Sequence, residues 1–226
     1  MDGAEDFAKE RFGLVPIACD AWGPLVFVNL DPEATPLLEA LGSLPERARG
    51  TAFPEMGFRL RVPYTIACNW KVYVDNYLEG YHIPRAHPGL NRAMDCAGYT
   101  VETDGGVVVQ GASGREAGDP SRYLYLWLWP NFMINVSPAY GQTNVIVPLG
   151  PESTLCIFDY FFPPGAGDAA VAEAVAWSDE IQREDIRLCE TVQRNLRSRS
   201  YVAGRYSPKR ENGLYHFHEM VRRAMA

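Results

Sequence analysis

The chain contains 226 residues, of which 47% are hydrophobic and 22% charged, and its formal net charge is −7 at pH 7. This length and composition are typical of a single globular domain with a sizeable core. The net negative charge argues against a nucleic-acid partner, and the chain has no run of 18 apolar residues that could cross a membrane.

The N-terminal third is expected to mix short strands and helices. Residues 21–32 predict a buried strand that ends in a turn, and residues 35–48 carry the apolar face of a short helix. Residues 58–64 alternate, as a half-buried strand does. Residues 69–81 place aromatic side chains at helical spacing, and Pro84 then interrupts regular structure.

The second half predicts a sheet followed by one long helix. Five β-rich runs, separated by turn-forming residues, fit an antiparallel meander: 107–110, 123–129, 132–136, 143–148 and 154–162. Residues 169–200 predict a single helix laid across that sheet. Strands followed by a long helix indicate an α+β fold, and no repeat or linker divides residues 1–226 into two domains.

Two of the four histidines stand close together in Glu79-Gly-Tyr-His82-Ile-Pro-Arg-Ala-His87. This spacing alone is weak, and two unrelated histidines are the ordinary alternative. In a continuous helix the two side chains would point about 140° apart. Because Pro84 breaks the helix, a loop can turn both histidines toward one ion. Two neighbouring acids, Asp75 and Glu79, could orient the imidazoles.

Asp185 is the carboxylate that could complete a metal site. On the long helix it lies about 30° from the centre of the apolar stripe. That stripe consists of Ala174, Ile181, Leu188, Val192 and Leu196. A buried carboxylate needs a cation or hydrogen-bond donors, so the pattern leaves two readings open, a buried salt bridge or tyrosine contact and a metal ligand. Two imidazoles with one carboxylate are the ligand set of a mononuclear non-haem iron(II) site.

The segment around His82 and His87 resembles a motif of a known family. Asn69-Trp-Lys…Asp75-Asn-Tyr-Leu-Glu-Gly-Tyr-His82-Ile-Pro-Arg-Ala-His87-Pro is similar to the iron motif of Rieske-type non-haem iron oxygenases, the large subunits of ring-hydroxylating dioxygenases and related N-demethylases. Further matches follow in order along nearly the whole chain: Trp22-Gly-Pro-Leu-Val-Phe-Val-Asn-Leu-Asp, Trp129-Pro-Asn-Phe-Met-Ile-Asn, Val147-Pro-Leu-Gly-Pro, Glu184-Asp-Ile-Arg-Leu-Cys-Glu and Gly204-Arg-Tyr-Ser.

The resemblance implies which residues carry the chemistry. It assigns His82, His87 and Asp185 as ligands of Fe(2+). It makes Glu79 the acid that joins the iron site to an electron donor, because this acid stands three residues before the first ligand histidine. Glutamate at that position resembles the branch that acts on choline, carnitine or betaine-like quaternary amines. The neighbouring Asp75 and Asn76 are the other candidate catalytic residues.

The resemblance also implies fold and assembly. It predicts a helix-grip (START/Bet v1-like) domain, in which a curved antiparallel sheet wraps around a long C-terminal helix. It further implies a homotrimer in which the Rieske cluster of one subunit serves the iron of the next. The cluster-binding pair Cys-x-His…Cys-x-x-His does not occur in these residues, so we expect a catalytic domain without a [2Fe-2S] cluster, served by a separate Rieske or ferredoxin-type donor.

The expected activity is the O2-dependent hydroxylation of a small organic substrate. A quaternary ammonium compound is the first choice and an aromatic compound the second. The pocket beside the iron should be lined by residues of 123–136 and 143–162. The alternative is a non-catalytic helix-grip protein that binds a small ligand or an assembly partner and carries a vestigial iron site.

The remaining features predict structure and compartment. Five cysteines are scattered without pairs, which favours reduced thiols, and the acidic N-terminus does not fit a secretory signal. We therefore expect a cytoplasmic protein, with Cys156 and Cys189 in its core. The alternating aromatic run 123–129 predicts one face of a sheet core. His216 and His218 are expected in packing or at an interface.

Overall fold

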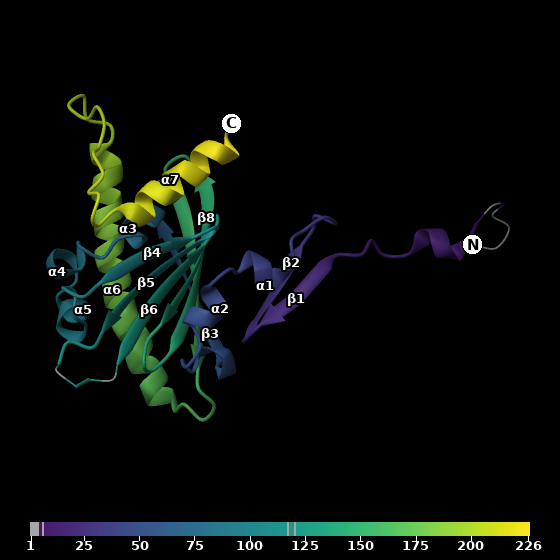
Figure 1. Cartoon of the computed structure of the whole chain (residues 1–226), viewed down its shortest axis with the longest axis horizontal. Helices are drawn as coiled ribbons and strands as arrows, with labels where there is room; N and C mark the ends of the chain where they lie inside the picture. Colours follow the sequence, from purple (N-terminus) through teal and green to yellow (C-terminus); the bar gives the residue numbers. More distant parts are fainter. Residues whose placement is uncertain (1–4, 6, 117, 120) are drawn as a thin grey trace.

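A seven-stranded antiparallel sheet forms the centre of the fold (Figure 1). The computed structural model describes residue 5 and residues 7–116, 118–119 and 121–226. The strands are β3 (Gly57–Ile66), β4 (Thr100–Asp104), β5 (Val107–Ser113), β6 (Arg122–Leu128), β7 (Phe132–Val136), β8 (Gly141–Gly150) and β9 (Ser153–Phe162). Their order is β3-β9-β8-β7-β6-β5-β4, and every neighbouring pair is antiparallel. The predicted antiparallel α+β arrangement is confirmed.

Helices and short turns cover both faces of this sheet. One face carries α3 (Trp70–Tyr77), α6 (Asp168–Asn195) and α7 (Asn212–Ala224), and the other carries α1 (Leu37–Ala40) and α2 (Leu44–Arg47). The remaining elements are α4 (Ile83–Ala86), α5 (Pro88–Ala93), η1 (Lys9–Phe12) and η2 (Phe53–Glu55). No helix in the described part of the chain combines the length and apolar character that crossing a bilayer requires.

The sheet is buried on both faces because its strands alternate between two cores. In β5, Val108 packs with α3, α6 and α7, whereas Val107 and Val109 pack with α1 and α2. In β6, Trp127 packs against Phe217 of α7, and its neighbour Leu126 points to the opposite core. Successive side chains of a strand point to opposite faces of the sheet. An uninterrupted apolar run therefore indicates a strand that is buried on both faces. The predicted core role of the run 123–129 is confirmed.

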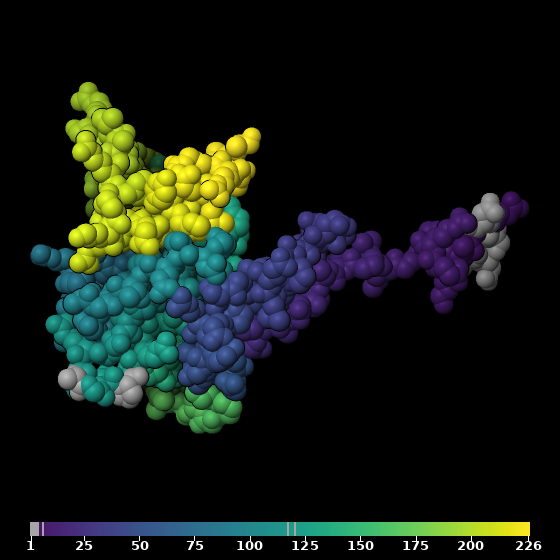
Figure 2. Space-filling view, in the orientation of Figure 1, coloured from purple at the N-terminus to yellow at the C-terminus, as the bar shows by residue number. Residues whose placement is uncertain are grey.

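The prediction of a buried strand at 21–32 is wrong. These residues belong to a hairpin of β1 (Ala18–Trp22) and β2 (Leu25–Asn29), which turns at Gly23 with φ 55°. Figures 1 and 2 show the hairpin and the segment before it extending away from the main sheet. Val26 and Val28 are 72% and 67% exposed. Apolar residues can specify a strand, but they do not specify what covers it.

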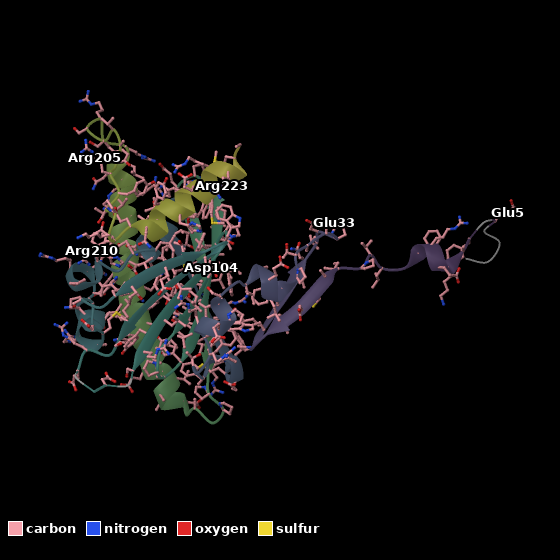
Figure 3. All side chains as sticks on the ribbon, viewed as in Figure 1. Glu5, Glu33, Asp104, Arg205, Arg210 and Arg223 are labelled. Carbon is pink, nitrogen blue, oxygen red and sulfur yellow. The ribbon has the colours of Figure 1, made fainter. Side chains whose placement is uncertain are left out.

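The hairpin joins the body at its turn end. Trp22 and Leu25 contact the core beneath α1 and α2. In Figure 3, Glu33 lies beyond the hairpin, whereas Asp104 lies on the sheet. There the Asp104 carboxylate accepts a hydrogen bond of 3.1 Å from the Ser43 N–H. This contact fixes the start of α2 against the end of β4.

Several predicted helix boundaries also change. The helix expected at 35–48 is divided into α1 and α2 at Gly42, whose φ of 53° few other residues adopt. Helix α3 is capped by Asn69, whose side chain accepts a hydrogen bond from the Lys71 N–H, and it ends at Tyr77 rather than at 81. The long helix ends at Asn195 instead of 200, and it is not the last helix, because α7 follows and was not predicted.

The buried face of α6 is also rotated from the predicted stripe. Ser178 and Gln182 lie near its centre, whereas Val192 and Leu196 are 40% and 38% exposed. The two polar side chains are buried because each has a buried partner. Gln142 Nε2 donates to Ser178 Oγ at 2.9 Å, and Tyr73 donates to Gln182 at 2.7 Å. Hydrophobic periodicity cannot anticipate such pairs.

Candidate metal centre

Three segments bring His82, His87 and Asp185 together. His82 directly precedes α4, His87 lies between α4 and α5, and Asp185 lies in the middle of α6. The backbone at His87 (φ −122°, ψ 80°) is not helical, so the two histidines do not follow one helical face. Pro84 lies in the first turn of α4, where proline is tolerated. The helix therefore breaks at His87 and not at Pro84 as predicted, and this break allows both imidazoles to converge.

The three side chains meet at their potential ligand atoms. His87 Nε2 lies 3.0 Å from Asp185 Oδ1 and 3.2 Å from His82 Nε2, and His82 Nε2 lies 3.8 Å from Asp185 Oδ1. Ligand atoms at right angles around a metal with bonds of about 2.1 Å stand about 3.0 Å apart. The triangle is therefore close to one face of an octahedral site. Among the described residues these three form the group that could hold a metal ion.

Two glutamates determine which imidazole nitrogens are free. Glu79 contacts His82 Nδ1, and Glu184 Oε2 lies 2.8 Å from His87 Nδ1. A carboxylate favours the tautomer that carries its proton on the contacted nitrogen. Both Nε2 atoms are then unprotonated and point at each other and at a carboxylate oxygen. Three lone pairs that converge in this way repel one another unless a cation lies between them, so the donor set itself fits a divalent metal.

Burial and charge act in opposite directions on His87. The residue is 1% exposed. Its burial lowers the pKa of the imidazole, but the hydrogen bonds and charges of Asp185 and Glu184 outweigh this effect, and the pKa is raised overall. The site therefore attracts positive charge. A metal cation can replace the proton that the two carboxylates favour.

Of the three candidate catalytic residues, Asn76 and Glu79 contact the triad, whereas Asp75 does not. Asn76 Nδ2 donates to Asp185 Oδ1 at 2.7 Å, so it orients the carboxylate. Glu79 is 8% exposed and also accepts from the Tyr81 N–H at 2.7 Å. Asp75 does not reach either histidine of the triad. Its Oδ1 lies 2.7 Å from His218 Nε2, and burial raises the pKa of Asp75 although this hydrogen bond acts in the opposite direction.

Glu184 was not a candidate from the sequence. It directly precedes Asp185 on α6. Its carboxylate reaches His87 because α4 packs against α6, which no local pattern reveals. The available signal was its position beside a candidate ligand, because ligand histidines usually donate their second N–H to an acceptor.

Glu184→Gln is expected to weaken divalent-metal binding by about 10- to 100-fold, since outer-shell acceptors typically contribute that much. Titration of the metal-free chain with Co(II) or Fe(II), followed by absorbance or calorimetry, measures the change. Glu180→Gln is the matched control, because Glu180 is an exposed residue one turn earlier on the same helix. Equal affinities for the Glu184 variant and the control would contradict the orienting role.

A cavity of about 100 Å³ adjoins the triad. Its walls come from α3, α6 and the strands β6 to β9, which agrees with the pocket expected at 123–136 and 143–162. Seven aromatic side chains contribute to them: Tyr73, Tyr77, Tyr99, Tyr125, Tyr140, Phe158 and Trp177. Burial raises the pKa of Tyr73, Tyr77, Tyr99 and Tyr125 well above the ordinary value. These phenols are therefore neutral at physiological pH.

Comparisons with known proteins agree with this geometry. Residues 53–226 match the family model for the ring hydroxylating alpha subunit (catalytic domain). The chloroplastic choline monooxygenase of Arabidopsis thaliana is 36% identical over 96% of this chain and 56% of the relative. The carnitine monooxygenase oxygenase subunit of Escherichia coli K12 is 32% identical over 97% of this chain and 64% of the relative.

A solved structure extends the likeness to three dimensions. A quaternary ammonium Rieske monooxygenase, described with carnitine oxidation and inter-subunit electron transfer, superposes with a TM-score of 0.82 and 27% sequence identity. The superposition covers 98% of this chain and 66% of that one. The chain thus spans between about half and two thirds of the length of these relatives.

Proposed function

The chain belongs to the family of ring hydroxylating alpha subunit catalytic domains, and from this premise we propose that it is the catalytic domain of a mononuclear non-haem iron oxygenase. The observation that carries the proposal is the convergence of two imidazole nitrogens and one carboxylate oxygen within 3.0–3.8 Å. A non-catalytic binding protein would not need two glutamates that direct both Nε2 atoms to one point. The complete ligand set therefore favours an oxygenase over the vestigial alternative.

His82, His87 and Asp185 are the proposed ligands of Fe(2+). When bound, iron supplies the redox chemistry by which an oxygen atom from O2 enters a C–H bond. The protein's own contribution is positional. Glu79 and Glu184 hold the imidazoles in the ligand tautomer, and Asn76 holds the Asp185 carboxylate. The aromatic walls exclude water from the neighbouring cavity.

A quaternary ammonium compound is the proposed substrate. The relatives named for choline and carnitine support this class. So does the cavity, because aromatic faces bind cationic ammonium groups. A cavity of about 100 Å³ is also small against the 300–1,000 Å³ common for drug-sized ligands. It favours a compact substrate over a polycyclic aromatic one.

The electrons would come from a Rieske or ferredoxin-type protein or domain outside these residues. Inter-subunit electron transfer in a structural relative supports a trimer in which a neighbouring subunit supplies the cluster. The sheet with α6 laid along it supports assignment to the helix-grip class. Five free cysteines support a reducing compartment such as the cytoplasm.

The test is turnover by the iron-loaded chain with hydrogen peroxide, which supplies oxygen and two electrons together. Choline should be oxidised in limited amounts, either at the alcohol carbon or at an N-methyl group with release of formaldehyde, and mass spectrometry detects the products. Zinc-loaded chain is the control, because zinc is not redox-active. Iron bound to the chain without oxidised choline, carnitine or aromatic acid would refute the oxygenase assignment.

A further inference from the structure

Two buried carboxamides in the cavity wall carry hydrogen-bonding atoms without partners in the described residues. Asn144 of β8 is 1% exposed and Gln182 of α6 is 2% exposed, and both line the cavity. Gln182 accepts the Tyr73 hydroxyl proton through Oε1, which leaves its Nε2 unpaired. Asn144 Oδ1 is unpaired as well. Buried polar atoms are nearly always hydrogen-bonded, so an unpaired donor and an unpaired acceptor in one cavity point to a ligand.

The two amides belong to a strand and a helix that lie side by side. Gln142 Nε2 donates to Ser178 Oγ at 2.9 Å, which anchors β8 beside α6. Farther along, Gln193 of α6 contacts Glu152, just beyond the end of β8, so the strand and the helix run in the same direction. Asn144 lies about 7 Å beyond Gln142 along the strand, and Gln182 lies about 6 Å beyond Ser178 along the helix. They therefore form the next pair after Gln142 and Ser178.

This pair adjoins the metal centre. Gln182 precedes Asp185 by one turn of α6, and its partner Tyr73 precedes Asn76 by one turn of α3. Side chains three residues apart on a helix are neighbours. A group held by the two amides therefore belongs to a molecule that also reaches the triad.

The charge of the cavity restricts what that molecule is. Among the described residues, the lining side chains include Glu79 and Asp185 but no lysine or arginine. Its other polar lining groups are neutral amides, hydroxyls and phenols, and the two ligand imidazoles. A substrate carboxylate held at the two amides would have no lysine or arginine beside it among the described lining residues, and burying it unpaired is costly. A cation is favoured by the aromatic faces.

We propose that Asn144 and Gln182 form a hydroxyl-binding subsite, which makes the preferred substrate a compact quaternary ammonium alcohol rather than a betaine-like carboxylate. The inference rests on the proposed function and names the substrate class within it. A hydroxyl group donates to the Asn144 amide oxygen and accepts from the Gln182 amide N–H, so it matches the pair as the structure orients it. A carboxylate only accepts, and it would leave Asn144 Oδ1 facing another lone pair.

Calorimetric titration of the zinc-loaded full chain with three trimethylammonium compounds tests the subsite. Choline carries the hydroxyl, propyltrimethylammonium replaces the hydroxyl with a methyl group, and glycine betaine replaces the CH2OH group with a carboxylate. Choline should bind about 10-fold tighter than propyltrimethylammonium and about 100-fold tighter than glycine betaine, since loss of one buried hydrogen-bond partner and burial of an unpaired charge have effects of this order. These comparisons use the wild-type chain and need no variant to fold.

Two variants assign the preference to the amides. Asn144→Leu and Gln182→Leu should each remove most of the advantage of choline over propyltrimethylammonium. Gln193→Leu, on the same helix but outside the cavity lining, should leave it unchanged. Equal binding of all three compounds, or tighter binding of glycine betaine, would overturn the subsite and leave the quaternary ammonium assignment standing. Absence of binding by all three, with zinc retained, would overturn both.

Discussion

Asp185→Ala is expected to reduce iron from about one atom per chain to near zero after anaerobic reconstitution with Fe(II) and desalting. The change removes one of three ligand groups, so the affinity should fall by more than the roughly 100-fold that marks the upper range for orienting residues. The fold should persist, because the described polar contacts of the Asp185 side chain are with Asn76 and the two histidines only. Iron is measured by mass spectrometry, and the fold by circular dichroism.

Asp179→Ala is the matched control for this loss. Asp179 lies on the same helix six residues earlier, where it forms a surface pair with Arg183 at 2.7 Å. It does not contact the triad, so the variant should keep the wild-type iron content. Stoichiometric iron in the Asp185 variant would show that the carboxylate is not a ligand, and the structural reading of Asp185 as a hydrogen-bond partner of Asn76 would replace it.

The central sheet was predictable because strand signals are local. The predicted runs 107–110, 123–129, 132–136, 143–148 and 154–162 coincide closely with β5 to β9. Exposure was not predictable in the same way. The apolar hairpin β1–β2 has the pattern of a covered strand, yet its outer side chains are exposed in this chain. Coverage depends on neighbours far away in sequence, and composition does not reveal them.

For the candidate site too, the local features were predictable from the sequence and the tertiary contacts were not. The register of α6 showed that Asp185 faces inward but left its partner undecided. Resemblance, rather than periodicity, associated it with His82 and His87. The role of Glu184 depends on where α4 and α5 carry His87, which is a tertiary property. The polar pair Asn144 and Gln182 interrupts two otherwise apolar patterns, and only the packing of β8 against α6 explains why polar side chains lie there.

Glu79 has two proposed roles, orienting His82 and joining His82 to an electron donor, and a single substitution can separate them. Its carboxylate accepts from the His82 Nδ1–H and from the backbone N–H groups of Tyr81 and His82. Glutamine keeps one accepting oxygen but directs an NH2 group toward an N–H donor, so the orientation of His82 should weaken without being lost. The proposed path for electrons from a donor needs the carboxylate itself, because it would join the donor's histidine to His82. Peroxide does not use that path.

Glu79→Gln is therefore expected to affect two reactions of the iron-saturated protein unequally. Turnover driven by a Rieske donor added in trans should fall by roughly 100-fold, and peroxide-driven turnover by less than about 10-fold. Glu184→Gln is the comparison variant, because Glu184 orients the other ligand histidine and has no proposed role in electron transfer. It should reduce both reactions to the same extent. If Glu79→Gln also reduced both equally, Glu79 would act only by shaping the iron site, and its bridging role would be withdrawn.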